Sequence, residues 1–358
     1  MKILKSIDWL IVLPIIVIFS LSLLIIFSIN AKFTSSQLIF LLIGLVGYFV
    51  FANLDYRILE KFPLFLYLIS LFLLLLTFII GRVTRGSIRW IEIGALNFQS
   101  SEFIKPLLIL SFSAWVIQLN LTKMKNLFTL VFICLVPVLL VFKQPDLGNS
   151  LVILAIWLGI IFAAGIPIKY MLLWLAVFIL GFPFAWHWLK PYQQQRIVTF
   201  LNPNFDPLGS GYNLLQSIIT VGSGEFLGRG LGKGTQSQLR FLPEHHTDFI
   251  FSSFSEELGF LGASILMMAY LIMLARILVI AKNTPDNFGR LVCLGVFMMI
   301  FFQLLVNVGM NLGIFPITGV TLPLFSAGGS SLITVLISLG IVQNISTFLQ
   351  RKAVIEIK

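Results

Sequence analysis

WLIVLPIIVIFSLSLLIIFSI, residues 9–29, contains no charged side chain. A helix needs about 20 apolar residues to cross the hydrocarbon core of a bilayer, so this run is long enough to span a membrane. It is longer than the hydrophobic region of a signal peptide, and no small-x-small cleavage site follows it. We therefore expect a membrane-spanning helix that is not removed.

The composition of the whole chain agrees with this reading of its first segment. Of the 358 residues, 58% are hydrophobic and only 11% are charged, whereas a soluble domain has roughly 25% charged residues. Too few polar side chains remain to cover a water-facing surface. The chain is therefore predicted to be an all-α, polytopic integral membrane protein that forms a single domain over residues 1–358.

Nine further apolar runs have about the length of a membrane span. They lie at 36–53, 63–80, 103–119, 127–142, 149–166, 169–188, 250–280, 291–315 and 331–349. The pattern predicts ten transmembrane helices. Nine or eleven are the alternatives, because the fifth run is short and the fourth begins with a charged pair.

The distribution of Lys and Arg predicts the orientation of these helices. With ten spans and an inside N-terminus, thirteen basic residues fall in the inside segments and five in the short outside loops. Cytoplasmic loops carry such an excess, so both termini are predicted to be cytoplasmic. The same bias explains most of the net charge of +10, and we expect no nucleic-acid partner.

One connection is much longer than the others. Residues 189–249 form a loop of 61 residues, which the orientation places outside the membrane. Loops of this length are usually functional or disordered. Because this one contains Trp, Tyr, Phe and Leu among its polar residues, we expect it to fold back over the helix bundle.

Charged residues at membrane depth are costly, so each is a candidate for function. Glu102 and Lys105 are three positions apart at the outer end of the fourth span, where they share one helix face and can pair. They form either a self-neutralising ion pair or part of a polar cavity. Asp146, between the helix breakers Pro145 and Gly148, either caps the sixth span or faces that cavity.

The long loop contains eight glycines between Gly209 and Gly234. Lys233 is followed by glycine rather than Ser or Thr, and GxGxxG is absent, so a nucleotide site is not supported. The glycines are expected to allow tight turns where backbone approaches backbone or ligand.

The most informative stretch is GTQSQLRFLPEHHTDFIF, residues 234–251. Asp248 lies at the start of the eighth span, where it could cap the helix or, ionised near a helix N-terminus, accept a proton. The adjacent His245 and His246 lack the further spaced ligands of a zinc site. Further along this span, the spacing of Ser253 and Glu256 is typical of a capping box.

At these residues the chain resembles the SEDS family, the shape, elongation, division and sporulation proteins, and its elongation branch more than its division branch. The resemblance covers nearly the whole chain through seven motifs in order. They are Arg85–Trp90, Gln99–Lys105, Gln144–Gly148, Gln194–Pro203, Asp206–Tyr212, Gly234–Phe251 and Gly319–Ser330.

The resemblance implies ten helices in the inner membrane of a bacterium, with both termini in the cytoplasm. It implies a glycosyltransferase that polymerises lipid II on the outer face of that membrane, releasing undecaprenyl pyrophosphate during cell elongation. It also implies partnership with a class B penicillin-binding protein, which supplies the cross-linking transpeptidase, and with other proteins of the elongation complex.

The resemblance also assigns residues. The essential acid falls on Asp248, the conserved pair on Glu102 and Lys105, and the cavity acid on Asp146. Ala327 is a departure, because the family usually has Tyr at this position, before Gly-Gly-Ser, and this leaves its role in the cavity open.

The mechanism that we expect is inverting glycosyl transfer with Asp248 as the general base. Pyrophosphate leaves with negative charge, so Arg196, Lys105 and Arg89 are the candidate cations that meet it. Gln238 and Ser330 are further candidate substrate contacts. No cofactor or metal ligand set is predicted, although a divalent cation, Mg²⁺ or Mn²⁺, could share the work of the cations.

Two other functions fit parts of the pattern. A transporter that flips lipid II would also use many helices and a polar cavity. However, its key groups should lie near the membrane midplane on broken helices, whereas the motifs here gather beside the outer loop. A non-catalytic scaffold would leave the crowded polar loop unexplained.

Overall fold

The computed structural model describes residues 7–84, 87–93, 96–187, 189–239 and 241–356. Arg85 and Arg240, which belong to two of the sequence motifs, lie outside this range. Within it, each of the ten predicted apolar runs falls on a long helix. These helices are α1 (Trp9–Ile29), α2 (Ala31–Asn53), α3 (Pro63–Ile80), α4 (Ser100–Gln118), α5 (Met124–Lys143), α6 (Leu147–Ala163), α7 (Ile168–Trp186), α11 (Ile250–Asn283), α12 (Asn287–Asn311) and α13 (Gly329–Glu356).

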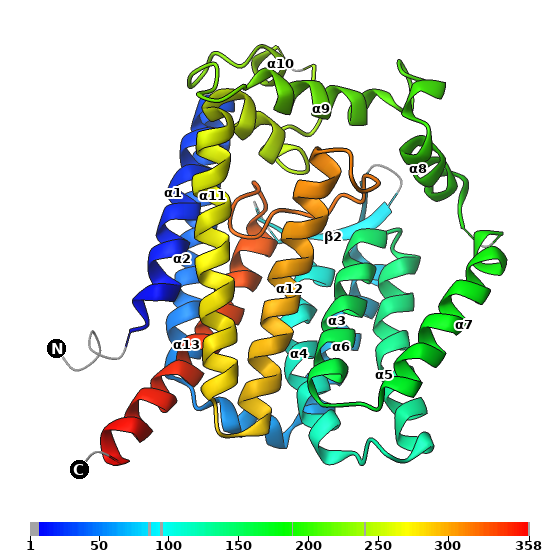
Figure 1. Ribbon diagram of the computed structural model, residues 1–358, viewed down its shortest axis with the longest axis vertical. Coiled ribbons are helices and arrows are strands. Elements are labelled where there is room, and N and C mark those ends of the chain that lie inside the picture. Colours follow the sequence, from blue (N-terminus) through cyan, green and yellow to red (C-terminus); the bar gives the residue numbers. More distant parts are fainter. Residues whose placement is uncertain (1–6, 85–86, 94–95, 188, 240, 357–358) are drawn as a thin grey trace.

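The helices form an upright bundle, in which α1 begins and α13 ends at the same end (Figure 1). Eight of them are long and apolar enough to cross a membrane, and α6 is a shorter apolar helix. Large apolar side chains face outward, among them Val46 and Phe128, which are 65% and 66% exposed. Such a surface suits lipid rather than water. The helical membrane fold is thus confirmed, while the number of crossings and the sides of the termini stay predictions.

The helices α4 and α13 occupy the centre of the bundle. Within their membrane-length segments, 78% of α4 residues and 83% of α13 residues are buried. Small residues allow helices to approach them closely. On α2, a Cβ added to Gly44 would lie 2.5 Å from Leu336 of α13. On α12, a Cβ added to Gly295 would lie 2.8 Å from Ile109 of α4.

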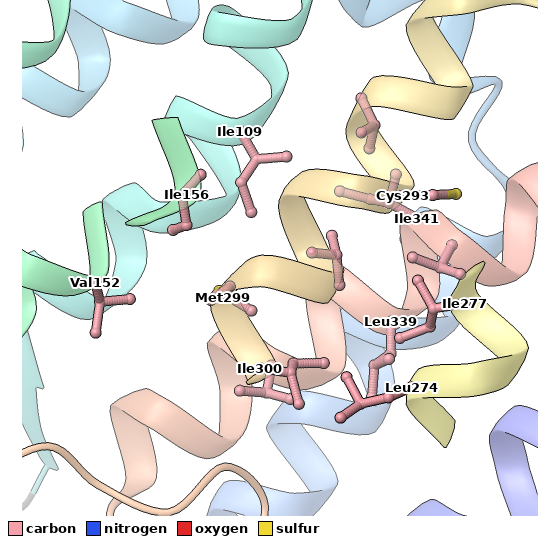
Figure 2. Packing of buried hydrophobic residues seen from close by; sticks show 14 of the residues in the cluster. Ile109, Val152, Ile156, Leu274, Ile277, Cys293, Met299, Ile300, Leu339 and Ile341 are labelled. Carbon is pink, nitrogen blue, oxygen red and sulfur yellow. The ribbon is translucent and has the colours of Figure 1, made fainter. Parts of the chain in front are cut away.

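The apolar core continues between the later helices. Figure 2 shows Leu274 of α11, Ile300 of α12 and Leu339 of α13 gathered in one cluster, and all three are buried. This packing fixes the helices that carry the polar residues at the other end of the bundle.

A small antiparallel sheet precedes α4, where the sequence analysis expected only a loop. Its strands are β1 (Arg82–Thr84), β2 (Ser87–Ile93) and β3 (Leu96–Gln99), in the order β1-β2-β3. Trp90 pairs with Gln99 and Ile91 with Phe98. Because β3 runs directly into α4, the sheet places Arg89 and Gln99 beside the polar start of that helix.

In its described residues, 189–239 and 241–249, the predicted outer loop is folded, as expected, into three α-helices and a 3₁₀ turn. They are α8 (Pro191–Leu201), η3 (Pro203–Phe205), α9 (Tyr212–Ser223) and α10 (Thr235–Gln238). Helix α9 packs against α11 and α12, and α9 and α10 cover the end of the bundle opposite to the end of α13 (Figure 1). The prediction that this loop folds back over the bundle is confirmed.

Helix α11 is interrupted at Gly259, where φ is +66°. Main-chain groups of residues 225–230 fill the gap: Phe260 N donates to Glu225 O at 2.9 Å, and Arg229 N donates to Glu256 O at 2.9 Å. A Cβ added to Gly228 would lie 2.2 Å from Glu257 O. The glycines thus allow backbone to approach backbone, as the sequence predicted.

Candidate active site

A polar cavity of about 330 Å³ opens beneath the outer loop. It lies where the sheet, the starts of α4 and α6, helix α8 and the segment between α12 and α13 meet. Six of the eight candidate site residues line it. They are Arg89, Glu102, Asp146, Arg196, Asp248 and Ser330.

Asp248 is half-buried and lines this cavity. The N-cap of α11 is Phe249, so the alternative that Asp248 merely caps the helix is wrong. Its backbone carbonyl instead accepts hydrogen bonds from the side-chain amides of Asn307 and Asn311, both at 3.1 Å. These two amides belong to fully buried residues of α12, so the main chain of Asp248 is fixed while its carboxylate borders the cavity.

Asp146 satisfies both of its sequence-based interpretations. It caps α6 by accepting from Asn149 N at 3.2 Å, and it also lines the cavity. Its carboxylate further accepts from Gln99 Nε2 at 2.8 Å and Ser101 Oγ at 3.0 Å. These donors hold the acid of α6 against the start of α4.

Glu102 and Lys105 form the predicted ion pair, with 2.7 Å between Lys105 Nζ and Glu102 Oε2. Lys105 is completely buried and also donates to Asn149 Oδ1 at 3.0 Å. Two charges removed from water need such close partners to offset their desolvation. Glu102 reaches the cavity, whereas Lys105 lies behind it and is not among the lining residues.

Two arginines supply positive charge to the cavity. Arg89 donates from Nε to Gln144 O at 3.0 Å and from Nη2 to Pro145 O, so it holds the turn between α5 and α6. Arg196 on α8 is exposed, and its guanidinium lies 5.9 Å from the ring centre of Tyr192. Although the residue as a whole is exposed, desolvation of its guanidinium, followed by the nearby charge of Arg89, lowers the pKa of Arg196, while Asp248 opposes this effect. A guanidinium stays protonated despite such a shift. The positive charges of Arg89 and Arg196 therefore lie in the same cavity as Asp248.

The last two candidate residues have different surroundings. Ser330, near the start of α13, accepts from Gln99 N at 3.0 Å and donates to Asn97 O at 3.2 Å, so it joins the sheet to α13 at the cavity wall. Gln238 does not line the cavity. Its Nε2 donates to Glu257 Oε1 at 3.1 Å and to Ser28 O at 3.0 Å, which places it in the contact between α10, α11 and α1.

The capping-box interpretation of Glu256 is wrong. Its carboxylate accepts from Gln236 N at 2.9 Å and from Ser237 N at 3.0 Å, and Ser253 Oγ donates to His245 O at 3.2 Å instead. Glu256 therefore binds the outer loop rather than its own helix end.

The adjacent histidines have structural contacts. His245 Nδ1 lies 2.9 Å from Leu242 O, and His246 stacks on Phe33 with 4.7 Å between ring centres. Among the described residues, no group of three His, Cys, Asp or Glu side chains could hold a metal ion.

Several cavity residues were not singled out from the sequence. Trp90, Glu244, Thr247, Thr318 and Thr321 also line the cavity. Trp90, Glu244 and Thr247 stand within motifs that the resemblance identified, as does Thr321, but their residue types gave no separate signal. Together they add an aromatic ring, hydroxyls and a further acid to a site of opposed charges. Such a site could bind a sugar that carries an anionic group.

Comparison with known proteins is consistent with this geometry. Residues 2–351 match the family model of FtsW, RodA and SpoVE, described as cell cycle proteins. The peptidoglycan glycosyltransferase MrdB of Escherichia coli K12 is 39% identical over 312 residues, which are 85% of this chain and 83% of that protein.

Two solved structures share the fold over almost the full length. A chain from a peptidoglycan synthase complex, studied for the coordination of polymerization and crosslinking, has a TM-score of 0.85 and 33% identity, with 96% of this chain and 98% of that chain covered. The rod shape determining protein RodA of Thermus thermophilus has a TM-score of 0.73 and 30% identity, with coverage of 95% and 96%.

Proposed function

The chain belongs to the FtsW/RodA/SpoVE family and is a peptidoglycan glycosyltransferase, and we propose that it joins lipid II into glycan strands at the cavity around Asp248. The observation that carries this proposal is the convergence of the half-buried Asp248 with Arg89 and Arg196 in a single cavity. Glycosyl transfer from a pyrophosphate needs both parts: a group that accepts a proton and cations that receive the leaving charge.

In the proposed reaction, the 4-hydroxyl of the terminal N-acetylglucosamine of lipid II attacks C1 of the N-acetylmuramic acid at the end of the growing strand. A new glycosidic C–O bond forms on one face of the sugar as the bond from C1 to the pyrophosphate oxygen breaks on the other. The hydroxyl proton passes to Asp248, and undecaprenyl pyrophosphate leaves with the bonding electrons. Attack from the opposite face inverts the configuration at C1.

Arg196 and Arg89 are the proposed partners of the pyrophosphate. Guanidinium groups match phosphate oxygens with two parallel hydrogen bonds. Arg196 is exposed in the cavity wall, and its charge interacts with that of Asp248. Lys105, buried behind Glu102, is proposed to act as a positioning residue that holds Glu102 and Asn149 in the wall.

The lipid tail of the substrate also needs a place. An apolar cavity of about 510 Å³ lies between α2, α3, α4 and α13. Phe103 lines it while the preceding residue, Glu102, lines the polar cavity, so the start of α4 separates the two spaces. We assign the tail to the apolar cavity and the pyrophosphate sugar to the polar one.

The same division supports a proposal for where the enzyme acts. A multi-pass membrane protein with its polar cavity under a long outer loop is proposed to act on the outer face of the bacterial inner membrane during cell elongation. The proposed partner is a class B penicillin-binding protein, which would cross-link the strands. The support for that partner is the similar chain from a complex that coordinates polymerization and crosslinking.

The test is polymerisation of labelled lipid II by the purified full chain with its transpeptidase partner. Asp248→Asn should lower the rate at least about 100-fold, because a general base contributes roughly 10²–10⁴-fold. A matched control is Asp55→Asn. Asp55 caps η2 (Tyr56–Lys61) outside the cavity, and Asn caps a helix as well as Asp does. If Asp248→Asn polymerises at the normal rate, Asp248 is not the base.

Transport of lipid II across the bilayer is the alternative that this assay must separate. The charged groups gather where the outer loop meets the starts of α4, α6 and α11, rather than near the midplane, where transporters place them. In sealed vesicles, a transporter would expose labelled lipid II on the other face without lengthening it. Polymerisation would instead yield long strands on one face.

A further inference from the structure

A second cavity, of about 250 Å³, lies beside the first, between α8, α9 and the chain that follows α12. Helix α8 contributes positions 192, 195, 196, 199 and 200, which form one face of a helix. The two cavities adjoin. Arg196 lines both, and Ile317 lines the second while the next residue, Thr318, lines the first.

The linings of the two cavities differ in charge. Arg196 is the one charged residue among the described side chains of the second cavity. Glu102, Asp146, Glu244 and Asp248 add four acids to the first. The second cavity therefore suits a neutral ligand, with a single cation at its border with the first.

The neutral lining consists of amides, hydroxyls and rings. Gln195 and Asn213 supply side-chain amides, Thr199 and Ser210 supply hydroxyls, and Tyr192 supplies an aromatic ring. Thr199 Oγ1 donates to Ser210 Oγ at 3.1 Å. Amides can both donate and accept hydrogen bonds, as the hydroxyl and acetamido groups of an N-acetylated sugar require.

Tyr192 offers a further handle for such a ligand. Its hydroxyl is enclosed and has no hydrogen-bond partner among the described residues. An enclosed polar group without a partner is costly, so a rotation of the Tyr192 side chain that brings its hydroxyl to a ligand in the cavity would be favoured. The ring of Tyr192 can at the same time pack against the C–H face of a sugar.

From these observations we propose that the second cavity binds the uncharged part of the growing glycan strand, the sugars that precede the one carrying the pyrophosphate. This proposal rests on the proposed function of the first cavity. Arg196 would then stand between the pyrophosphate end of the strand, in the first cavity, and its neutral sugar backbone, in the second.

The first experiment measures binding apart from activity. The probe is fluorescently labelled tetra-N-acetylchitotetraose, which has N-acetylated sugars but neither pyrophosphate nor lipid, added to the full chain in lipid nanodiscs. Gln195→Ala combined with Asn213→Ala should weaken binding about tenfold, because each change removes one neutral hydrogen-bonding group. The matched control is Asn204→Ala, at an exposed residue outside both cavities, which should bind as wild type does.

The second experiment measures the product. In the lipid II assay, the same double variant should shorten the mean strand length several-fold relative to wild type and Asn204→Ala, because the strand leaves more often between additions. Tyr192→Phe, which removes only the enclosed hydroxyl, should have the same effect in a smaller degree.

The outcomes separate the two proposals. The glycan site is overturned if the tetrasaccharide does not bind wild type, or if it binds the double variant as tightly. That result leaves the role of Asp248 intact whenever Asp248→Asn still loses polymerisation. Conversely, if Asp248→Asn polymerises normally while tetrasaccharide binding depends on Gln195 and Asn213, the proposed base fails and the glycan site stands.

Discussion

Two groups of acids flank the same junction between the outer loop and α11, and their surroundings differ. Asp248 is half-buried at the cavity, and its backbone carbonyl is held by Asn307 and Asn311. Two turns further along, Glu256 and Glu257 are completely buried, and their carboxylates accept hydrogen bonds from the loop that returns over the bundle.

The partners of these glutamates are specific. Glu256 accepts from the main chain of Gln236 and Ser237, and Glu257 accepts from Ser28 Oγ at 2.6 Å and Gly232 N at 3.0 Å. Their oxygens are used to fasten the loop to α11 and α1. The difference teaches that burial of an acid does not identify its chemistry. An acid with a chemical role is better identified by a carboxylate that reaches a cavity while other groups anchor its main chain.

A substitution of Lys105 tests whether the buried ion pair of Glu102 and Lys105 stabilises the fold, as Glu256 and Glu257 do. Lys105→Met leaves Glu102 buried without its cation, which should cost about 3–5 kcal/mol of unfolding free energy. Thermal unfolding of the purified protein measures the loss. Lys105→Met with Glu102→Gln should recover most of it, and a double variant as unstable as the single one would contradict a direct pairing.

Glu256→Gln should separate the two groups of acids most clearly. The amide nitrogen cannot accept the bonds from Ser237 that the carboxylate accepts at 3.0 and 2.8 Å. Hydrogen bonds to a charged group contribute about 1.5–3 kcal/mol each, so we expect a loss of about 3 kcal/mol. Asp248→Asn should leave the unfolding temperature nearly unchanged. A large loss of stability in Asp248→Asn would remove the distinction.

Gln238→Ala addresses the candidate residue that lies outside the cavity. Its side-chain hydrogen bonds, to Ser28 O, Ser28 Oγ and Glu257 Oε1, are expected to contribute about 1–2 kcal/mol to stability. The polymerisation rate at a temperature well below unfolding should stay within about twofold of wild type. A loss of rate like that of Asp248→Asn would return Gln238 to the substrate contacts.

The smallest expected effect is a pH dependence of the turn between α8 and α9. Hydrogen bonds from Ser210 N at 2.8 Å and Gly209 N at 3.0 Å hold the pKa of Asp206 below its usual range. A depressed pKa gives stability that is present above about pH 3.9, the unfolded value, and is lost as the pH falls through the folded pKa. Cleavage of this turn by pepsin, relative to a reference peptide, should therefore rise with acidification. Asp206→Asn should abolish the rise.

Much of the fold could be predicted because each helix that crosses the lipid needs a run of about 20 apolar residues. The run at 9–29 matches α1 residue for residue, and the other nine runs fall on helices. The start of α4 was placed three residues late, since the polar Ser100, Ser101 and Glu102 are buried inside the bundle rather than outside it. The sheet was missed because strands of three to seven residues carry too little periodicity to distinguish them from a loop.

The candidate site also has a part that local sequence predicts and a part that it does not. The ion pair of Glu102 with Lys105 follows from their spacing alone, but the meeting of Asp146, Arg196 and Asp248 was expected only from the family resemblance. These residues are brought to one cavity by the long-range packing of α4, α6 and α12 and by the return of the outer loop, which no local pattern contains. The place of Gln238 could not be foreseen, because its partner Ser28 lies 210 positions away.

The break at Gly259 has a mechanical consequence. Four main-chain hydrogen bonds link residues 225–230 to the two sides of the gap in α11. The loop therefore holds the two pieces of the helix together. The short outer piece of α11 is joined through residue 249 directly to Asp248. A displacement of residues 225–230 would therefore also break hydrogen bonds to the piece of α11 that adjoins the candidate base.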